Sequence, residues 1–70
     1  DAKTMLQELS LKKFKKLPTY KTLSNSGPRH KPIFKVGVKL PNTEYFISVG
    51  KSKKEAQQNA ARKLLEFLKI

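Results

Sequence analysis

Three lysines stand close together in the second half of the chain, at Lys51, Lys53 and Lys54. They flank Ser52, which forms with Glu55 the Ser-x-x-Glu pattern of a helix N-terminal capping box. A helix N-terminus offers free N–H groups and partial positive charge, both of which suit a phosphate. Lysine disfavours helix stability there, because acids are preferred in the first turn. The spacing therefore predicts phosphate binding; the simpler interpretation is a normally capped helix with solvated lysines.

A second group with binding chemistry is Gly27-Pro28-Arg29-His30, which Pro32 follows two residues later. Glycine permits a positive φ, and the two prolines stiffen the loop at both ends. A stiff loop that carries Arg29 and His30 suits insertion into a groove of a partner. The simpler interpretation is a turn between two strands whose histidine is merely exposed.

The third group is a polar helix face near the start of the chain, made of Thr4, Gln7 and Glu8. Residues three and four apart share one helix face, so these side chains lie together. Glutamine donates and accepts hydrogen bonds and glutamate accepts them, so both can meet hydroxyl groups and base edges. In isolation an ordinary solvated helix face explains the same pattern.

Catalytic chemistry is not expected in these residues. The five acidic residues are scattered along the chain and show no two-metal pattern. They are Asp1, Glu8, Glu44, Glu55 and Glu66. His30 has no nucleophile or partner acid close in sequence. Without cysteine, the chain has neither a disulfide framework nor a thiolate metal site. We therefore predict no catalytic residue, no metal site and no cofactor in this segment.

Length and charge limit the remaining functions. A chain of 70 residues is expected to form one domain, residues 1–70, and its net charge of +11 suits a polyanion. Nucleic acid, an anionic membrane surface and an acidic protein all fit that charge. All basic residues but Arg29 and Arg62 are lysines, which hold phosphates rather than read bases. No apolar run reaches the roughly 20 residues of a membrane span, so we expect a cytoplasmic domain without a membrane partner.

The elements that must position these groups follow from hydrophobic spacing. Apolar residues at helical spacing predict a helix from Asp1 to Phe14, capped by Asp1 or Thr4 and ended by Leu17-Pro18. Alternation predicts three strands, and turn residues mark the segments between them. The strands are Thr19–Ser24, Ile33–Leu40 and Tyr45–Val49, with a loop over Asn25–Pro28, a turn at Pro41-Asn42 and a break at Gly50.

Apolar faces indicate how these elements pack. Phe34, Val36, Val38 and Leu40 share one face of the second strand, and Tyr45, Ile47 and Val49 alternate in the third. A last helix, Lys53–Lys69, carries a stripe of Ala56, Ala60, Leu64 and Leu68, whose small first residues allow close approach to the sheet. We predict an α+β fold of order α-β-β-β-α, with two helices on one face of a three-stranded antiparallel sheet.

Four motifs in this order resemble the double-stranded RNA-binding domain, over essentially the whole chain. They are Leu17-Pro18-Thr19-Tyr20, Gly27-Pro28-Arg29-His30, Phe34, and Gly50-Lys51-Ser52-Lys53-Lys54-Glu55-Ala56 followed by Ala60-Ala61. The resemblance implies shape-based binding of double-stranded RNA with little sequence specificity. It places Thr4, Gln7, Glu8, Pro28, Arg29 and His30 in successive minor grooves, and Lys51, Lys53 and Lys54 on phosphates.

Three positions depart from the family pattern. Gln57 stands where the family often has a third basic residue, which predicts a weaker phosphate contact there. Ser48 stands where a glycine is common, and this change is expected to affect the end of the third strand more than RNA binding. Leu11 is apolar where many relatives are polar, so it is not predicted as a contact.

The opening run Asp1-Ala2-Lys3-Thr4-Met5-Leu6-Gln7-Glu8 resembles the start of the C-terminal RNA-binding domain of bacterial ribonuclease III. That resemblance implies a fragment of a longer endonuclease for double-stranded RNA. It also implies a separate nuclease domain with magnesium and a homodimer formed through that domain. The alternative is a module of the same fold used for protein–protein interaction or dimerisation; a basic domain of ribosomal-protein type is a third possibility.

Overall fold

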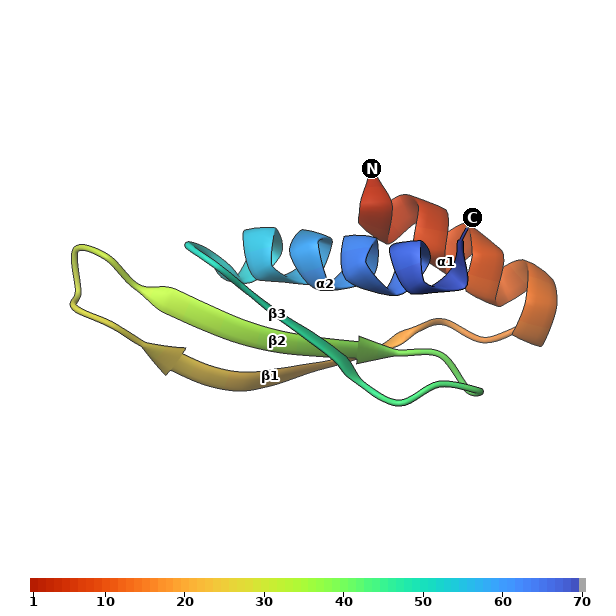
Figure 1. Ribbon diagram of the computed structural model, residues 1–70, viewed down its shortest axis with the longest axis horizontal. Coiled ribbons are helices and arrows are strands. Elements are labelled where there is room, and N and C mark those ends of the chain that lie inside the picture. The colour runs from red at the N-terminus through yellow and green to blue at the C-terminus, as the bar shows by residue number, and fades with distance from the viewer. Residues whose placement is uncertain (70) are drawn as a thin grey trace.

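The computed structural model describes residues 1–69, and Ile70, the last residue of the predicted domain, lies outside the described residues. The elements are α1 (Ala2–Phe14), β1 (Thr19–Ser26), β2 (Ile33–Lys39), β3 (Phe46–Gly50) and α2 (Lys53–Leu68). The three strands form one antiparallel sheet in the order β1-β2-β3. Both helices lie on one face of that sheet, and the opposite face is open (Figure 1). The predicted α+β fold is confirmed.

The core forms where α2 crosses the sheet. Ala56, Ala60 and Leu64 of α2 are fully buried, as are Val36 and Val38 of β2. Alternate strand residues point to opposite faces, so the predicted inward face of β2 is the one that α2 covers. The side chain of Leu6 anchors α1 to the same cluster. One shared core therefore fixes both helices against the sheet.

The first helix and the first strand differ from their predicted bounds. Asp1 is the N-cap of α1, since its Oδ1 accepts a hydrogen bond from the Thr4 N–H at 2.9 Å. The helix ends at Phe14, before Leu17-Pro18, with Lys15 in the left-handed region at φ 58°. β1 continues through Asn25 and Ser26, which the sequence assigned to a loop. A register shift between Thr22 and Ser24 lets the ladder with β2 continue to Ser26.

Two further ends move by one residue. β2 stops at Lys39, and Leu40 lies beyond the strand although it is buried. α2 stops at Leu68, where Lys69 forms a left-handed C-cap whose N–H donates to the Glu66 and Leu65 carbonyls. Such a cap satisfies carbonyls that the ending helix leaves without partners. These shifts leave the packing unchanged.

The third strand was placed one residue too early, and its alternation did not show which of its two faces is buried. β3 begins at Phe46 and includes Gly50, which pairs with Phe34. Tyr45, Ile47 and Val49 are 39%, 40% and 49% exposed, on the open face of the sheet. Alternation in a sequence separates the two faces of a strand without saying which one is covered. Ser48 and Gly50 share the other face with Phe46, and their small size makes room for α2.

The outer edge of β3 is covered by two side chains from α2. Asn59 Nδ2 donates to the Val49 carbonyl at 2.9 Å, and Lys63 Nζ donates to the Ile47 carbonyl at 3.0 Å. An edge strand otherwise offers free backbone groups to another chain. These two contacts tie α2 to β3 along its length and partly block that edge.

Tyr20 gives a stability prediction. Its hydroxyl is buried without a hydrogen-bond partner among the described residues, and desolvation by burial raises the pKa of Tyr20 above 10.0. Replacing Tyr20 by Phe is expected to raise the free energy of unfolding by up to about 1 kcal/mol at neutral pH, because an unsatisfied group is removed. Because the pKa of Tyr20 is higher in the folded chain than in the unfolded chain, its contribution to stability is fully present below the unfolded-state pKa near 10.0. This contribution is lost as the pH rises through the folded-state pKa.

Thermal unfolding of both proteins at neutral pH and at several alkaline pH values checks this prediction. The melting temperature of the Tyr20→Phe variant is expected to fall less than that of the unsubstituted chain as pH rises above 10.0. A variant that melts several degrees lower at neutral pH contradicts the prediction, because it shows that the hydroxyl has a stabilising partner.

Candidate nucleic-acid interface

The lysine group at the start of α2 rests on a defined helix cap. Ser52 Oγ accepts a hydrogen bond from the Glu55 N–H at 3.0 Å, and Glu55 Oε1 accepts one from the Lys51 N–H at 3.3 Å. The hydrogen bond from Glu55 to Ser52 is the one that the predicted capping box requires. The Glu55 carboxylate completes it by accepting from Lys51, the residue just before the N-cap, instead of from Ser52 itself. Lys51, Lys53 and Lys54 are all exposed. The cap fixes the backbone while the three ammonium groups face solvent.

The loop between β1 and β2 is a tight turn. The Lys31 N–H donates to the Pro28 carbonyl at 2.9 Å, which puts Arg29 and His30 at the tip of the turn. Gly27 has φ 86°, as the sequence allowed, and a Cβ there would lie 2.6 Å from the Lys31 carbonyl oxygen. Only glycine fits this position without strain. The side chains of Arg29 and His30 are thus exposed on a turn whose backbone is closed by a hydrogen bond.

The orientation of the polar face of α1 is fixed by the buried residues on the opposite side of the helix. Thr4, Gln7 and Glu8 are exposed, whereas Leu6 and Ser10 of the same helix are fully buried. Ser10 Oγ donates to the Lys16 carbonyl, so the chain that leaves α1 is tied to the helix. The buried side therefore sets which face of α1 meets solvent.

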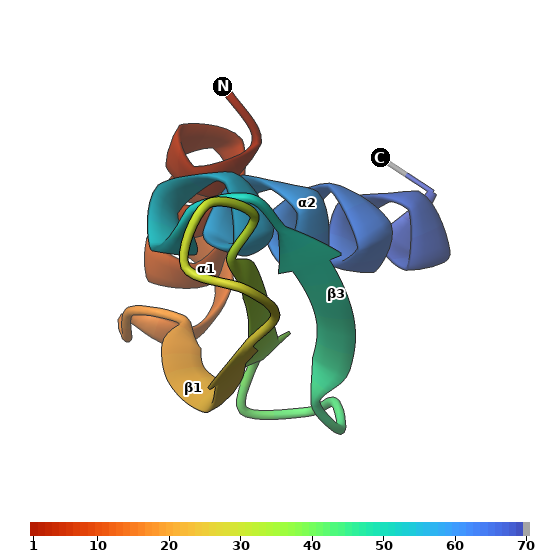
Figure 2. The ribbon, with the colours of Figure 1, turned by 90° about the vertical axis from the view of Figure 1, so that its left-hand side faces the viewer.

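The three groups follow one another along the long axis of the molecule, which measures 40 × 19 × 17 Å. The β1–β2 loop lies at one end, the start of α2 follows, and α1 lies beyond it (Figure 1). Seen along that axis, the loop, the start of α2 and α1 lie on the same side of the molecule (Figure 2). The fold thus brings the three elements that carry the predicted groups to one elongated side of the molecule.

Lys3 belongs to this surface, although sequence analysis did not select it. Its Nζ donates to Gln57 Oε1 at 2.9 Å, and its backbone N–H donates to Gln58 Oε1 at 3.2 Å. The same ammonium lies 5.3 Å from the centre of the Tyr20 ring. Gln57 is one helical turn after Lys53, so Lys3 places a positive charge beside the α2 lysines. We call these contacts of Lys3 with Gln57 and Gln58 the α1–α2 clasp.

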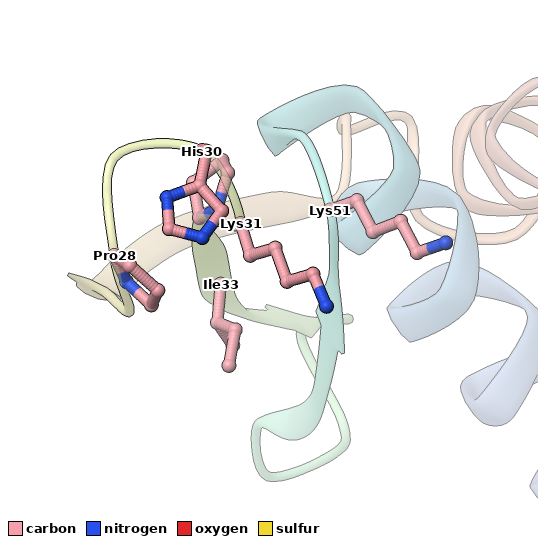
Figure 3. A pocket seen from close by; sticks show the side chains of 6 residues that line it. Pro28, His30, Lys31, Ile33 and Lys51 are labelled. Carbon is pink, nitrogen blue, oxygen red and sulfur yellow. The ribbon is translucent and has the colours of Figure 1, made fainter.

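A cleft of about 580 Å³ separates the loop from the start of α2. Pro28, His30 and Lys31 line the loop side, and Lys51 lines the other side (Figure 3). Pro32 and Ile33 complete the lining. The cleft joins the loop group to the lysine group and adds Lys31 and Ile33, which were not predicted as site residues.

The described residues contain neither a metal-binding group nor a membrane-spanning helix. Among residues 1–69 no group of three His, Cys, Asp or Glu side chains is placed to hold a metal ion. No helix in that range is long and apolar enough to cross a membrane.

Comparison with known proteins agrees with this geometry. The family model described as "Double-stranded RNA binding motif" matches residues 2–68. The Ribonuclease 3 of Pelagibacter ubique is 65% identical over 66 residues, which are 94% of this chain and 30% of that protein. The Ribonuclease 3 of Wolinella succinogenes is 53% identical over 67 residues, which are 96% of this chain and 28% of that protein. The chain thus spans about 30% of the length of these relatives.

Two solved structures of one protein, DRB4, have the same fold. The solution structure of its second dsRBD superposes with a TM-score of 0.69 at 34% identity, covering 99% of this chain and 96% of that one. The structure of both DRB4 dsRBDs with their linker gives a TM-score of 0.73 at 35% identity, covering 96% of this chain and 43% of that one. Sequence, family model and fold agree: the chain belongs to the double-stranded RNA-binding domain family.

Proposed function

We propose that this chain binds double-stranded RNA through the three groups on its elongated surface. The observation that carries the proposal is their alignment on one side of a body 40 Å long. An A-form duplex has a wide, shallow minor groove lined by 2′-hydroxyls, and domains of this kind contact two successive minor grooves over roughly 16 base pairs. In the proposed complex, α1 and the β1–β2 loop enter those grooves, and the start of α2 crosses the phosphates between them.

Each group has a distinct role in this complex. Gln7 and Glu8 meet 2′-hydroxyls and base edges, with Thr4 beside them on α1. Pro28, Arg29 and His30 fill the second minor groove at the tip of the loop. The ammonium groups of Lys51, Lys53 and Lys54 bind phosphates and carry no base information, so sequence preference is slight.

The relatives named Ribonuclease 3 support a wider proposal for the protein from which the chain comes. The chain is proposed to be the substrate-binding domain of a ribonuclease III, an endonuclease that cleaves double-stranded RNA. The described residues do not fit a magnesium site. Magnesium chemistry and homodimer formation are therefore proposed for a separate nuclease domain. Because the proposed ligand is cellular RNA, a cytoplasmic location is part of this proposal.

A gel-shift comparison tests the proposed ligand. The three probes are an RNA duplex of about 20 base pairs, long enough for the family footprint, a DNA duplex of the same sequence, and one RNA strand alone. We expect the RNA duplex to bind more tightly than the DNA duplex, because DNA lacks 2′-hydroxyls and the A-form groove. Equal affinity for the two duplexes would overturn the proposal.

The α1–α2 clasp gives a second prediction about duplex binding. Replacing Lys3 by Met is expected to weaken binding about five- to tenfold, since one hydrogen bond to a charged group contributes roughly 1.5–3 kcal/mol before solvent screening. The slope of log affinity against log salt is expected to fall by about one, because one counterion fewer is released. Gel shifts at several salt concentrations measure both quantities.

Two further variants show whether the charge or the clasp geometry matters. Gln57→Lys in the Lys3→Met background is expected to restore most of the affinity, because it returns a cation to the same place. Lys21→Met removes an equal charge from the open face of the sheet and is expected to leave duplex binding nearly unchanged. If Lys21→Met weakens binding as much as Lys3→Met, the effect reflects net charge and Lys3 has no specific role.

A further inference from the structure

The open face of the sheet carries side chains that the proposed duplex contacts do not use. We define the sheet-face site as Lys21, Lys35, Lys39, Tyr45, Ile47 and Val49. Ile47 and Val49 are 40% and 49% exposed, although apolar side chains of strands are usually covered. No helix covers this face (Figure 1). A mixed aromatic, apolar and basic surface is thus left without a partner.

Tyr45 is the centre of the sheet-face site. A Cβ added at Gly37 would lie 3.2 Å from Tyr45 Cδ1 and 3.5 Å from Ile47 Cγ1, so the Tyr45 ring packs on the bare backbone of β2. Lys39 Nζ and Lys21 Nζ lie 5.6 Å and 5.9 Å from the ring centre. The ring is still 39% exposed. An aromatic ring is therefore held against the sheet with one cation from β2 and one from β1 beside it.

The strand register surrounds this ring with positive charge. Lys21 pairs with Gly37, which pairs with Ile47 in turn, so one row crosses all three strands. Lys35 pairs with Val49. Because strand residues alternate between the two faces, Lys35 and Lys39 both lie on the face opposite the buried Val36. No acidic residue occurs within β1, β2 or β3. Glu44 directly precedes Tyr45, and the three lysines still leave the face with a net positive charge that is complementary to a polyanion.

We propose that the sheet-face site binds single-stranded RNA. A base stacks on Tyr45, the flanking lysines bind phosphates, and Ile47 and Val49 contact the neighbouring base. Proteins that bind single strands combine aromatic platforms with a basic track in this way. A duplex keeps its bases stacked inside and would leave the aromatic and apolar groups unused. The site lies on the face of the sheet opposite the helices and shares no residue with the proposed duplex contacts, although Val49 lines a small pocket together with Lys51.

Tyrosine fluorescence can report this binding directly. The chain has two tyrosines and no tryptophan, so in a Tyr20→Phe background the emission comes from Tyr45 alone. Titration with an unpaired RNA of about ten nucleotides, within the usual site size, is expected to quench that emission to saturation. An unchanged emission at saturating RNA overturns stacking on Tyr45.

Variants separate the two RNA surfaces. Tyr45→Ser is expected to weaken single-strand binding at least fivefold, in line with the cost of losing one base–aromatic stack, and to leave binding of a blunt duplex unchanged. Lys21→Met with Lys39→Met is expected to weaken single-strand binding about tenfold. Lys53→Ala with Lys54→Ala is expected to weaken duplex binding alone. Circular dichroism confirms that each variant is folded.

A competition experiment completes the test. Protein saturated with blunt RNA duplex is expected to bind labelled single-stranded RNA in a ternary complex, because the sheet-face site and the proposed duplex contacts have no residue in common. Displacement of one RNA by the other overturns the separate site. Equal quenching by polyglutamate or by phosphatidylserine vesicles also overturns the proposal, because it shows that an acidic protein or a membrane surface binds as well as RNA does. Concentration-dependent self-association through Tyr45 overturns it in favour of a second copy of the chain. The blunt-duplex arm tests the proposed function independently of these results.

Discussion

Replacing Lys53 and Lys54 together by alanine is expected to lower the affinity for double-stranded RNA about 100-fold. Two charge-assisted hydrogen bonds to phosphates are lost, each contributing roughly 1.5 kcal/mol or more, and about 1.4 kcal/mol is a tenfold change in affinity. Both side chains are exposed at the start of a capped helix, so they reach phosphates without rearrangement of the backbone. The loss is expected to be similar for all duplex sequences, because phosphate contacts carry no base information.

Salt dependence and stability distinguish this effect from misfolding. The slope of log affinity against log salt is expected to fall by about two, following the value of roughly 0.9 per phosphate measured for duplex DNA. The variant is expected to be as stable as the unsubstituted chain or slightly more stable, because lysines disfavour a helix N-terminus. An unchanged salt slope contradicts phosphate binding by these two lysines, and a large fall in melting temperature points to lost structure instead.

The local structures that carry the proposed binding groups were predictable because each depends on neighbours in sequence. The capping box that supports the α2 lysines spans Ser52 to Glu55, and the turn that presents Arg29 and His30 closes between Pro28 and Lys31. Short hydrogen-bonded motifs of this kind are encoded by residue types at fixed spacing. Their placement on one side of the molecule depends on packing, and it followed only from the shared core.

The features that sequence reasoning missed depend on contacts between distant residues. Lys3 and Gln57 are 54 positions apart, and although Gln57 departs from the family pattern, nothing in either helix shows that the two side chains meet. The choice of the buried face of β3 is equally non-local. Tyr45, Ile47 and Val49 alternate as a core face does, yet α2 packs on Phe46, Ser48 and Gly50 instead. Gly50 must lack a side chain because the start of α2 lies against it, and no pattern within β3 shows that requirement.

Gly50 makes that requirement measurable. A Cβ at this position would lie 2.4 Å from the Ala56 nitrogen and 2.9 Å from the Ala56 Cα, closer than such atoms approach in proteins. Because the obstructing atoms are backbone, the first turn of α2 must move. Gly50→Ala is expected to lower the free energy of unfolding by about 2–3 kcal/mol, the usual cost of overpacking. For a domain of this size that corresponds to a melting temperature about 10–20 °C lower.

Gly37→Ala is the matched control, since it adds the same methyl group to the same sheet. There the nearest atom is Tyr45 Cδ1 at 3.2 Å, and a side chain on an open face can turn aside. Its free energy of unfolding is expected to stay within about 1 kcal/mol of the unsubstituted value. Thermal and urea unfolding of both variants measure the difference. Equal stability of the two variants would show that the start of α2 is not pressed against β3.

The same pair of variants connects packing to binding. Gly50 directly precedes Lys51, and Ala56 lies in the first turns of the helix that begins at Lys53. A displaced helix start moves the α2 lysines away from the line that joins α1 to the β1–β2 loop. Gly50→Ala is therefore expected to weaken duplex binding even at temperatures where circular dichroism shows it folded, whereas Gly37→Ala binds duplex normally. Normal duplex binding by folded Gly50→Ala would mean that the exact position of the helix start does not matter for RNA.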